Sequence, residues 1–415
     1  MTINSSKSLK ICLISYRSNP HCGGQGVYIR NLSRALKELG HRVDVVAGPP
    51  DPQLPDGIEL HMLKTLDLYN PKSLFRTPSA RELLHPVNLM EWLSVCSMGY
   101  PEPFTFGFRA YAFLAKNWQR YDIVHDNQSL SYGIWAISKK IPTVATIHHP
   151  ITRDRDIAVA STRNLWKKIQ HRRWYSFIGM QKRVSRTLCR IITVSECSKK
   201  DISRDFAIPE HKFSVVPNGI DTDLFRPLPG VSRRENQIIV TNSADTPLKG
   251  LYYLLQAIAL IARKRRIRLT VIGTPKKNGG IEKLISRLAI GHLITFTGRV
   301  SDTEFVRHYA QASVAVVPSV YEGFGLPAGE AMACGLPVVT TTGGALPEVT
   351  GDAAMLVPPK NPEALAEAIT QLLDNPERAR ALGQAGYERI QQGFTWEKAA
   401  EKTIQTYREV IRDHG

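Results

Sequence analysis

The segment Val320–Val339 places the strongest constraint on the fold. It reads Val-Tyr-Glu-Gly-Phe-Gly-Leu-Pro-Ala-Gly-Glu-Ala-Met-Ala-Cys-Gly-Leu-Pro-Val-Val and lies between two strand-like runs, Val314–Pro318 and Val338–Thr340. Pro327 suits the first turn of a helix, where its missing N–H is not needed, and Gly335 suits the end of that helix. The segment therefore predicts a strand, a glycine loop, a short helix and a second strand.

The start of the predicted helix is a seat for a phosphate, because free backbone N–H groups and the helix dipole favour an anion there. Glu322 lies before this helix and Glu330 lies inside it. Carboxylates repel an anion, so we expect both to accept hydrogen bonds from hydroxyl groups of a ribose or a sugar ring. The alternative is a βαβ unit whose glycines only pack the helix on the sheet.

The run Glu-Gly-Phe-Gly-Leu-Pro from Glu322, followed by Glu330, resembles the signature of retaining glycosyltransferases of family 4. The resemblance implies the GT-B architecture, an α/β fold of two Rossmann-like domains that face an interdomain cleft. It implies a nucleotide-diphosphate sugar as co-substrate and no other cofactor. It also implies that Glu330 binds the ribose hydroxyls and that Glu322 contacts the donor sugar as a catalytic residue. The remaining donor-binding residues of this loop are then Gly323, Phe324, Gly325 and Leu326.

The length of 415 residues exceeds what one core usually holds, so two domains are expected. The resemblance places an acceptor domain at residues 1–225, completed by a C-terminal helix at 395–415, and a nucleotide-sugar domain at 226–394. The sequence has no apolar run of membrane-spanning length and no signal-peptide core in its polar start, which predicts a cytoplasmic protein. Its six cysteines form no Cys-x-x-Cys pair and are expected to be reduced.

The first domain offers two candidate sites at the ends of predicted strands. Gly23 and Gly24 follow the strand Lys10–Ser15, and the resemblance implies that their loop closes over the donor phosphates; a tight packing turn is the alternative. His148 follows the strand Thr143–Ile147, where ligand groups of open α/β sheets cluster. The family often has Thr-x-His here, so we expect His148 to be a catalytic residue that bonds a sugar or a phosphate. The alternative is a loop histidine that caps backbone groups.

The second domain is expected to hold the leaving group. Lys249, just before a predicted helix, matches the lysine that reaches the diphosphate in the family, and its charge would stabilise the breaking bond as a catalytic group. The arginine that precedes this lysine in the family falls near Ala244 here, and Asn242 is a candidate to replace it. The resemblance implies that the base binds near the turn that contains Val300. We expect no metal, because Lys249 and the helix start supply positive charge and no His, Cys or acidic set has ligand spacing.

The formal net charge of +17 predicts an anionic partner. Residues 157–195 contain nine basic side chains and no acidic one, with Trp166 and Trp174 among them. A helix of this kind can rest on an anionic membrane, here the inner face of the plasma membrane; a solvated helix face is the alternative. No helix-turn-helix or RNA-binding motif is present, so we expect no nucleic-acid partner.

The stretch 49–118 is rich in proline and aromatic residues and predicts loops with some helix. It either shapes an acceptor pocket, as in the family, or forms a surface insertion with its own apolar patch. Taken together, the sequence predicts metal-independent transfer of a hexosyl unit from a UDP- or GDP-sugar to a glycan or lipid-linked acceptor hydroxyl, with retention. Such a reaction belongs to cell-envelope glycan, polysaccharide or glycolipid synthesis. The rival interpretations are a GT-B-like sugar-nucleotide epimerase and a basic protein that binds membranes or nucleic acid.

Overall fold

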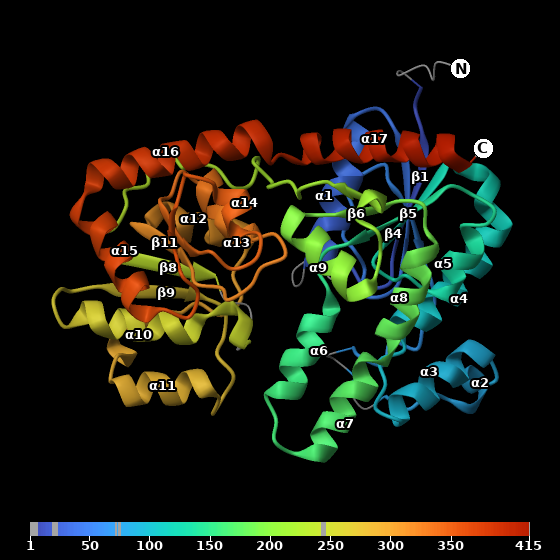
Figure 1. The fold of residues 1–415 in the computed structure, drawn as a ribbon, viewed down its shortest axis with the longest axis horizontal. Coiled ribbons are helices and arrows are strands. Elements are labelled where there is room, and N and C mark those ends of the chain that lie inside the picture. Colours follow the sequence, from blue (N-terminus) through green and yellow to red (C-terminus); the bar gives the residue numbers. More distant parts are fainter. Residues whose placement is uncertain (1–6, 19–23, 71–72, 74–75, 242–245, 415) are drawn as a thin grey trace. The chain divides into compact units, whose positions relative to one another are not determined.

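The chain forms two compact units in a computed structural model that describes residues 7–18, 24–70, 73, 76–241 and 246–414 (Figure 1). Unit 1 comprises Met1–Val194, Ser198–Val216 and Ala399–Gly415, and unit 2 comprises Ser195–Cys197 and Pro217–Lys398. Each unit is built around its own parallel sheet. The functional domain limits expected near residues 225 and 395 stay predictions.

The sheet of unit 1 has seven parallel strands in the order β3-β2-β1-β4-β5-β6-β7. Its central strands are buried along their length, as expected for a parallel sheet with both faces covered. The strands are β1 (Lys10–Ser15), β2 (Arg42–Ala47), β3 (Glu59–Met62), β4 (Ile123–Asn127), β5 (Thr143–Ile147), β6 (Ile191–Thr193) and β7 (Phe213–Val215).

The helices of unit 1 connect and cover these strands, and two of them, α9 and α17, begin in unit 2. They are α1 (Gly24–Glu38), α2 (Ala80–Leu83), α3 (Pro86–Cys96), α4 (Glu102–Asn117), α5 (Tyr132–Ile137), α6 (Ile151–Ala160), α7 (Leu165–Trp174), α8 (Ile178–Thr187), α9 (Glu196–Phe206) and α17 (Trp396–His414). Phe177, Met180, Val184 and Leu188 are buried, as their helical spacing predicts. The stretch 49–118 contains more helix than expected, because α4 buries Phe106, Ala110 and Leu114 in the core.

The sheet of unit 2 has six parallel strands in the order β10-β9-β8-β11-β12-β13. Figure 1 shows α10 on one side of this sheet and α12 and α13 on the other. The strands are β8 (Gln237–Thr241), β9 (Arg268–Ile272), β10 (Ile294–Phe296), β11 (Val314–Val317), β12 (Val338–Thr341) and β13 (Met355–Val357). The helices are α10 (Leu251–Ala262), α11 (Gly280–Leu288), α12 (Asp302–Gln311), α13 (Leu326–Ala333), α14 (Leu346–Thr350), α15 (Pro362–Asp374) and α16 (Pro376–Gly393).

Each sheet has one point at which the strand order reverses. In unit 1 this point lies between β1 and β4, and in unit 2 it lies between β8 and β11. Ligands of open α/β sheets bind outside the carboxyl ends of the strands at such a point, because the loops diverge there and leave room. The two switch points are therefore the first places to look for functional side chains.

Candidate functional site

The signature segment forms the predicted strand, glycine loop, helix and strand at the switch point of unit 2. Gly325 begins α13 with a φ of 105°, and a Cβ there would lie 2.7 Å from Leu346 Cδ2. The ring of Phe324 is buried, with its centroid 6.1 Å from that of Phe394. Because the ring packs inward, the loop offers backbone groups rather than an aromatic face to a ligand at the start of α13.

Glu322 and Lys249 form an ion pair directly beside this helix start. Lys249 Nζ lies 2.8 Å from Glu322 Oε1, and Ser319 Oγ donates a hydrogen bond of 2.7 Å to the same oxygen. Both side chains are partly exposed, at 34% for Lys249 and 11% for Glu322, so a ligand can reach them. The structure thus brings together two of the predicted catalytic residues, which are far apart in sequence.

Close packing of two loops fixes this pair. Lys249 ends a short 3-10 helix, Pro247–Lys249, after β8, and Gly250 follows with a φ of 70°. A Cβ on Gly250 would lie 1.9 Å from the carbonyl oxygen of Pro318, and Val320 N–H donates to the carbonyl of Leu248 over 2.7 Å. The loops that follow β8 and β11 are therefore held against each other, which sets the position of Lys249 beside Glu322.

Glu330 shares this electrostatic environment from inside α13. Burial raises the pKa of Glu330 to about 7, and the positive charge of Lys249 lowers it in part. Burial raises the pKa of Tyr309 well above its usual value, and the charge of Glu330 adds to this shift. The Tyr309 hydroxyl is hydrogen-bonded to Thr241 Oγ1 at 2.9 Å. The carboxyl group of Glu330 therefore has a pKa near neutral pH, and it lies close enough to Lys249 to feel the charge of that lysine.

The structure describes only some of the other predicted donor residues. Val300 follows β10 along the same carboxyl edge, two strands from β8 in the sheet order. Gly24 begins α1 in unit 1, and a Cβ there would meet no atom within 4 Å, so no close packing requires a glycine at this place. Gly23, Asn242 and Ala244 lie outside the described residues.

His148 follows β5, beside the switch point of unit 1, and its ring contacts Asn127 at the end of β4 and Tyr28 of α1. His148 Nε2 lies 2.8 Å from Asn127 Oδ1, and the His148 N–H donates to Gln128 Oε1 over 2.9 Å. The ring of Tyr28 meets the His148 ring edge-on, with 4.7 Å between centroids. Asn127 and Gln128 thus hold His148 from both its side chain and its backbone.

The hydrogen-bond network sets the protonation of His148. Asn127 Nδ2 donates to Ser15 Oγ and to the carbonyl of Gln25, so Asn127 Oδ1 is an acceptor and His148 Nε2 carries the proton. Burial lowers the pKa of His148 to about 3, with smaller contributions from His149 and His125. His148 is therefore neutral at pH 7, and its Nδ1 can accept a hydrogen bond from a hydroxyl group.

Three residues that the sequence analysis did not single out complete these sites. Asn127 and Gln128 orient His148, and Ser319 orients Glu322. All three lie at or just after the carboxyl end of a strand next to a switch point. The sequence does show that these polar residues follow buried strands. It does not show the order of the strands in the sheet, which determines that these residues lie next to a switch point.

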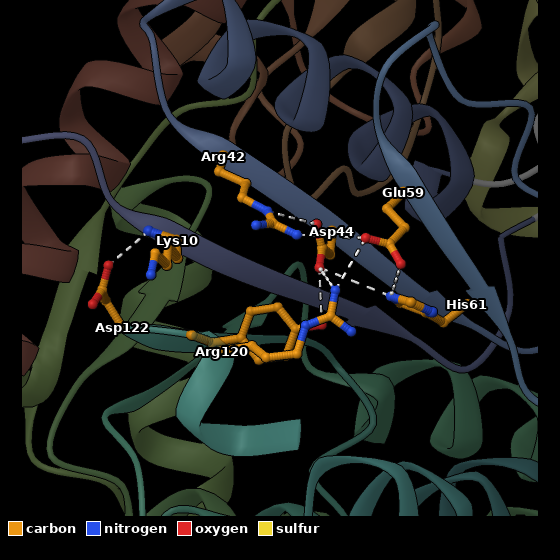
Figure 2. Close-up of polar contacts among 8 residues, drawn as sticks. Lys10, Arg42, Asp44, Glu59, His61, Arg120 and Asp122 are labelled. Carbon is orange, nitrogen blue, oxygen red and sulfur yellow. Dashed lines mark hydrogen bonds and ion pairs between the residues drawn. The ribbon is translucent and has the colours of Figure 1, made fainter. Parts of the chain in front are cut away.

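Among the described residues, one group has the geometry of a metal site, and it lies on the edge of the sheet of unit 1. Asp44, Glu59 and His61 come from β2 and β3, and Figure 2 shows Arg42 and Arg120 joined by dashed lines to the carboxylates of Asp44 and Glu59. Arg120 Nη2 lies 3.1 Å from Glu59 and 3.5 Å from Asp44. Because two guanidinium groups already balance these two acids, the cluster is an ion-pair network that supports the sheet edge.

Among the described helices, none is both long enough and apolar enough to span a lipid bilayer.

Comparisons with known proteins cover nearly the whole chain. Residues 22–224 match the model of "Glycosyltransferase Family 4", and residues 229–389 match that of "Glycosyl transferases group 1". The MMP alpha-(1->4)-mannosyltransferase of Mycolicibacterium hassiacum is 45% identical over 408 residues, which are 97% of this chain and 98% of the relative.

The chain belongs to glycosyltransferase family 4.

More distant relatives and solved structures extend this result. A D-inositol 3-phosphate glycosyltransferase of Segniliparus rotundus is 28% identical over 97% of this chain and 90% of its own. The sucrose-phosphate synthase of Thermosynechococcus elongatus superposes with a TM-score of 0.73 at 25% identity, covering 98% of this chain and all of that one. Anabaena Alr3699/HepE, solved with UDP and glucose, has a TM-score of 0.70 at 17% identity over 97% of this chain and 100% of its own, and it shows the fold alone.

The predicted family and fold are thereby confirmed. This family 4 protein has the GT-B fold, with two Rossmann-like units built on parallel sheets. It is a glycosyltransferase that acts in glycan synthesis. The roles assigned to individual side chains in its two switch points stay predictions.

Proposed function

We propose that this enzyme transfers a mannosyl unit from a nucleotide-diphosphate sugar, UDP- or GDP-linked, to a hydroxyl group of a glycan or lipid-linked acceptor, with retention of anomeric configuration. The sugar is chosen because the relative at 45% identity is named an alpha-(1->4)-mannosyltransferase and aligns with 97% of this chain. The product would be a cell-envelope glycan, a polysaccharide or a glycolipid.

The observation that carries the proposal is the cluster at the switch point of unit 2. Lys249 and the start of α13 offer positive charge to a diphosphate, and Glu322 and Glu330 offer acceptors to hydroxyl groups. A sugar nucleotide has both features, because its charged pyrophosphate lies between a ribose and a hexose. In this proposal Glu330 binds the ribose, and Glu322 orients the hexose.

Charge stabilisation explains how these groups would promote the reaction. When the bond between the anomeric carbon and the phosphate oxygen breaks, its electron pair stays on the diphosphate. Lys249 and the helix start stabilise that growing negative charge, which is where a fixed positive group lowers the barrier most. A ligand phosphate would also compete with Glu322 for Lys249 Nζ, freeing the Glu322 carboxylate for a sugar hydroxyl. We propose that these charges suffice without a metal or another cofactor.

Unit 1 would bind the acceptor. The unprotonated Nδ1 of His148 can accept a hydrogen bond from a sugar hydroxyl, while Asn127 and Gln128 keep the ring oriented. Because the imidazole is held neutral, His148 adds no positive charge that would compete with Lys249 for the phosphate. We propose no covalent nucleophile among these residues.

We further propose a cytoplasmic enzyme that associates with the inner face of the plasma membrane through residues 157–195, with no nucleic-acid partner. The support is the positive charge of this stretch, which contains nine basic residues and no acidic one.

A ligand screen followed by a variant tests this function. Thermal shift with UDP-, GDP- and ADP-sugars should reveal one base that raises the melting temperature, because a ligand that binds only the folded state stabilises it. Calorimetry with that nucleotide should then show about tenfold to hundredfold weaker binding by Glu330→Ala, which loses a hydrogen bond to a charged group. Glu367→Ala, which removes an exposed acid on α15, is the control. Unchanged nucleotide affinity in Glu330→Ala would refute the assignment.

A further inference from the structure

Helix α3 buries a charged side chain and exposes apolar ones, which is the reverse of the usual arrangement on a surface helix. Its one buried side chain is an acid, Glu91, which is 2% exposed and paired with Arg109 at 2.6 Å. Three of its apolar side chains are exposed, namely Leu93 at 57% and Leu89 and Met90 at 41% each. A surface helix of a water-soluble domain normally does the reverse, so the outer face of α3 is built for apolar surroundings.

Helix α7 continues this unusual surface. It buries none of its ten residues, although Leu165, Trp166 and Ile169 lie on one side of it and are 76%, 59% and 52% exposed. The two helices are neighbours, because Arg173 Nη2 donates to Ser97 Oγ over 2.8 Å and Gln170 approaches Met98 Sδ at 3.2 Å. Figure 1 shows α2, α3 and α7 at the same end of unit 1.

This end of unit 1 concentrates the exposed apolar residues of the molecule. Eight of the thirteen exposed large hydrophobic side chains in the described structure lie on α7, on α3 or directly after α2, namely Leu84, Leu89, Met90, Leu93, Leu165, Trp166, Ile169 and Trp174. We call this set the apolar end. Apolar side chains gathered in this way mark an interaction surface rather than the scattered exposure that is normal on a monomer.

A basic hollow adjoins the apolar end. A cavity of about 540 Å³ between α6, α7 and α8 is lined by four cations, Arg155, Lys168, Arg172 and Lys182, and by one acid, Asp156. Arg155 pairs with Asp156 at 2.7 Å, so three positive charges remain for a ligand. The size and charge of this hollow suit a phosphate head group.

An apolar hollow shares a wall with the basic one. Its volume is about 600 Å³, and its lining includes Leu93, Phe104 and Met180. Ser176, in the turn between α7 and α8, and Gly179, in the first turn of α8, line both cavities. A cationic hollow beside an apolar one matches an amphiphile with an anionic head and an apolar chain.

We propose that the apolar end and the two hollows bind the surface of an anionic phospholipid bilayer, with a lipid phosphate in the basic hollow and acyl chain in the apolar hollow. The inference rests on the proposed peripheral location and adds the side chains that achieve it. Leu165, Trp166, Ile169 and Leu93 enter the boundary between head groups and chains, and the cations of α7 contact lipid phosphates.

Charge decides between a bilayer and a second copy of this chain as the occupant. A two-fold interface would place the same surface of α7 opposite itself. Residues 163–173 contain five basic side chains and no acid, so such a dimer would bring like charges together. An anionic bilayer offers the opposite charge to the same residues.

Vesicle sedimentation of the full-length protein tests this proposal. We expect the protein to sediment with vesicles of phosphatidylcholine and phosphatidylglycerol and to stay in solution with phosphatidylcholine alone. Lys168→Gln with Arg172→Gln should weaken partition about 25-fold, since each cation near an anionic surface contributes about fivefold. Trp166→Ser with Leu93→Ser should weaken it by about tenfold or more, because apolar area no longer enters the bilayer.

Matched controls separate this surface from general charge and hydrophobicity. Trp135→Ser removes another exposed tryptophan of unit 1, and Lys139→Gln with Lys140→Gln removes two other cations; both should partition like the wild type. Equal partition on both vesicle types, equal losses in the controls, or a dimer that Trp166→Ser dissociates in sedimentation velocity would overturn the proposal. Nucleotide binding by calorimetry should be unchanged in all these variants, so a failed lipid test leaves the donor assignment standing.

Discussion

The strand order reverses at the same place in both sheets, but the side chains at and beside the two switch points differ in charge. In unit 2 the ends of β8 and β11 carry an ion pair, Lys249 with Glu322, and a second acid, Glu330, lies near that lysine. In unit 1 the ends of β4 and β5 carry uncharged groups, His148 held by Asn127 and Gln128. One edge is built from charges and the other from neutral hydrogen-bonding groups.

This difference in charge fits the proposed division of the reaction between the two units. A diphosphate leaving group needs fixed positive charge, and its attached hydroxyl groups need strong acceptors. An acceptor hydroxyl needs orientation by a group that does not attract the phosphate to the wrong place. Burial achieves the second condition by lowering the pKa of His148 to about 3, which keeps the imidazole neutral.

The largest expected effect comes from removing the positive charge of the unit 2 site. Lys249→Ala should lower kcat/KM by about a hundredfold to a thousandfold, because the transition state loses a preorganised charge beside the leaving group. Initial rates with the nucleotide sugar identified by thermal shift measure this loss. Lys264→Ala, an exposed lysine after α10, is the control and should be neutral. A rate within threefold of the wild type would show that the charged edge is not where the bond breaks.

A smaller loss is expected at the neutral site. His148→Ala should lower kcat/KM by about tenfold, as expected for one neutral hydrogen bond to the acceptor, while nucleotide affinity stays unchanged. Steady-state kinetics in the acceptor and calorimetry in the nucleotide separate these two readouts. If His148→Ala instead weakened nucleotide binding as strongly as Glu330→Ala, the division between a donor site and an acceptor site would be wrong.

The contributions of Glu330 and His148 to the free energy of unfolding should change in opposite directions with pH. The pKa of Glu330 rises from 4.5 to about 7 on folding, so its stabilisation is complete below 4.5 and is lost as the pH rises through 7. The pKa of His148 falls from 6.5 to about 3, so its stabilisation is complete above 6.5 and is lost as the pH falls toward 3.

Two variants with uncharged, non-titrating side chains test this opposite pH dependence in the ligand-free protein. Relative to the wild type, the melting temperature of Glu330→Gln should be higher by about 2–4 °C at alkaline than at acidic pH, and that of His148→Asn should shift the other way. Scanning calorimetry at about pH 5 and about pH 8 measures both. Shifts of the same sign in the two variants would contradict the opposite burial effects.

The smallest effect is expected from a variant that changes only how the Glu322 side chain is oriented. Ser319→Ala removes the hydroxyl that donates to Glu322 Oε1, leaving the Lys249 ion pair in place. We expect kcat to fall by about threefold to tenfold with little change in nucleotide affinity, in line with one neutral hydrogen bond. Ser286→Ala, at an exposed position of α11, is the matched control. A loss as large as that of Lys249→Ala would mean that Ser319 contacts the substrate itself.

Local sequence was sufficient to predict the loop, helix and strands that form the unit 2 site. The glycine at 325 has the left-handed conformation that the predicted loop requires, and the helix starts and ends where Pro327 and Gly335 suggested. These features are set within a few residues, so their physics can be read from the chain. The buried strands were equally clear, because parallel strands covered on both faces are continuously apolar.

Long-range features could not be read in the same way. The contact of Lys249 with Glu322 spans 73 residues and depends on the packing of Gly250 against Pro318. The inverted polarity of α3 was also hidden, because Glu91 is buried by pairing with Arg109 on another helix. A pattern of apolar residues predicts a helix, but it does not state which of its faces meets the core.

The most direct test of the central claim is whether Lys249 binds the phosphate nearest to the sugar. Calorimetry should compare the nucleoside diphosphate with the corresponding monophosphate, each titrated into the wild type and into Lys249→Ala. We expect the wild type to bind the diphosphate about tenfold to hundredfold more tightly than the monophosphate, and we expect Lys249→Ala to lose most of this preference because the lost contact is to a charged group. A preference of the same size in both proteins would contradict it.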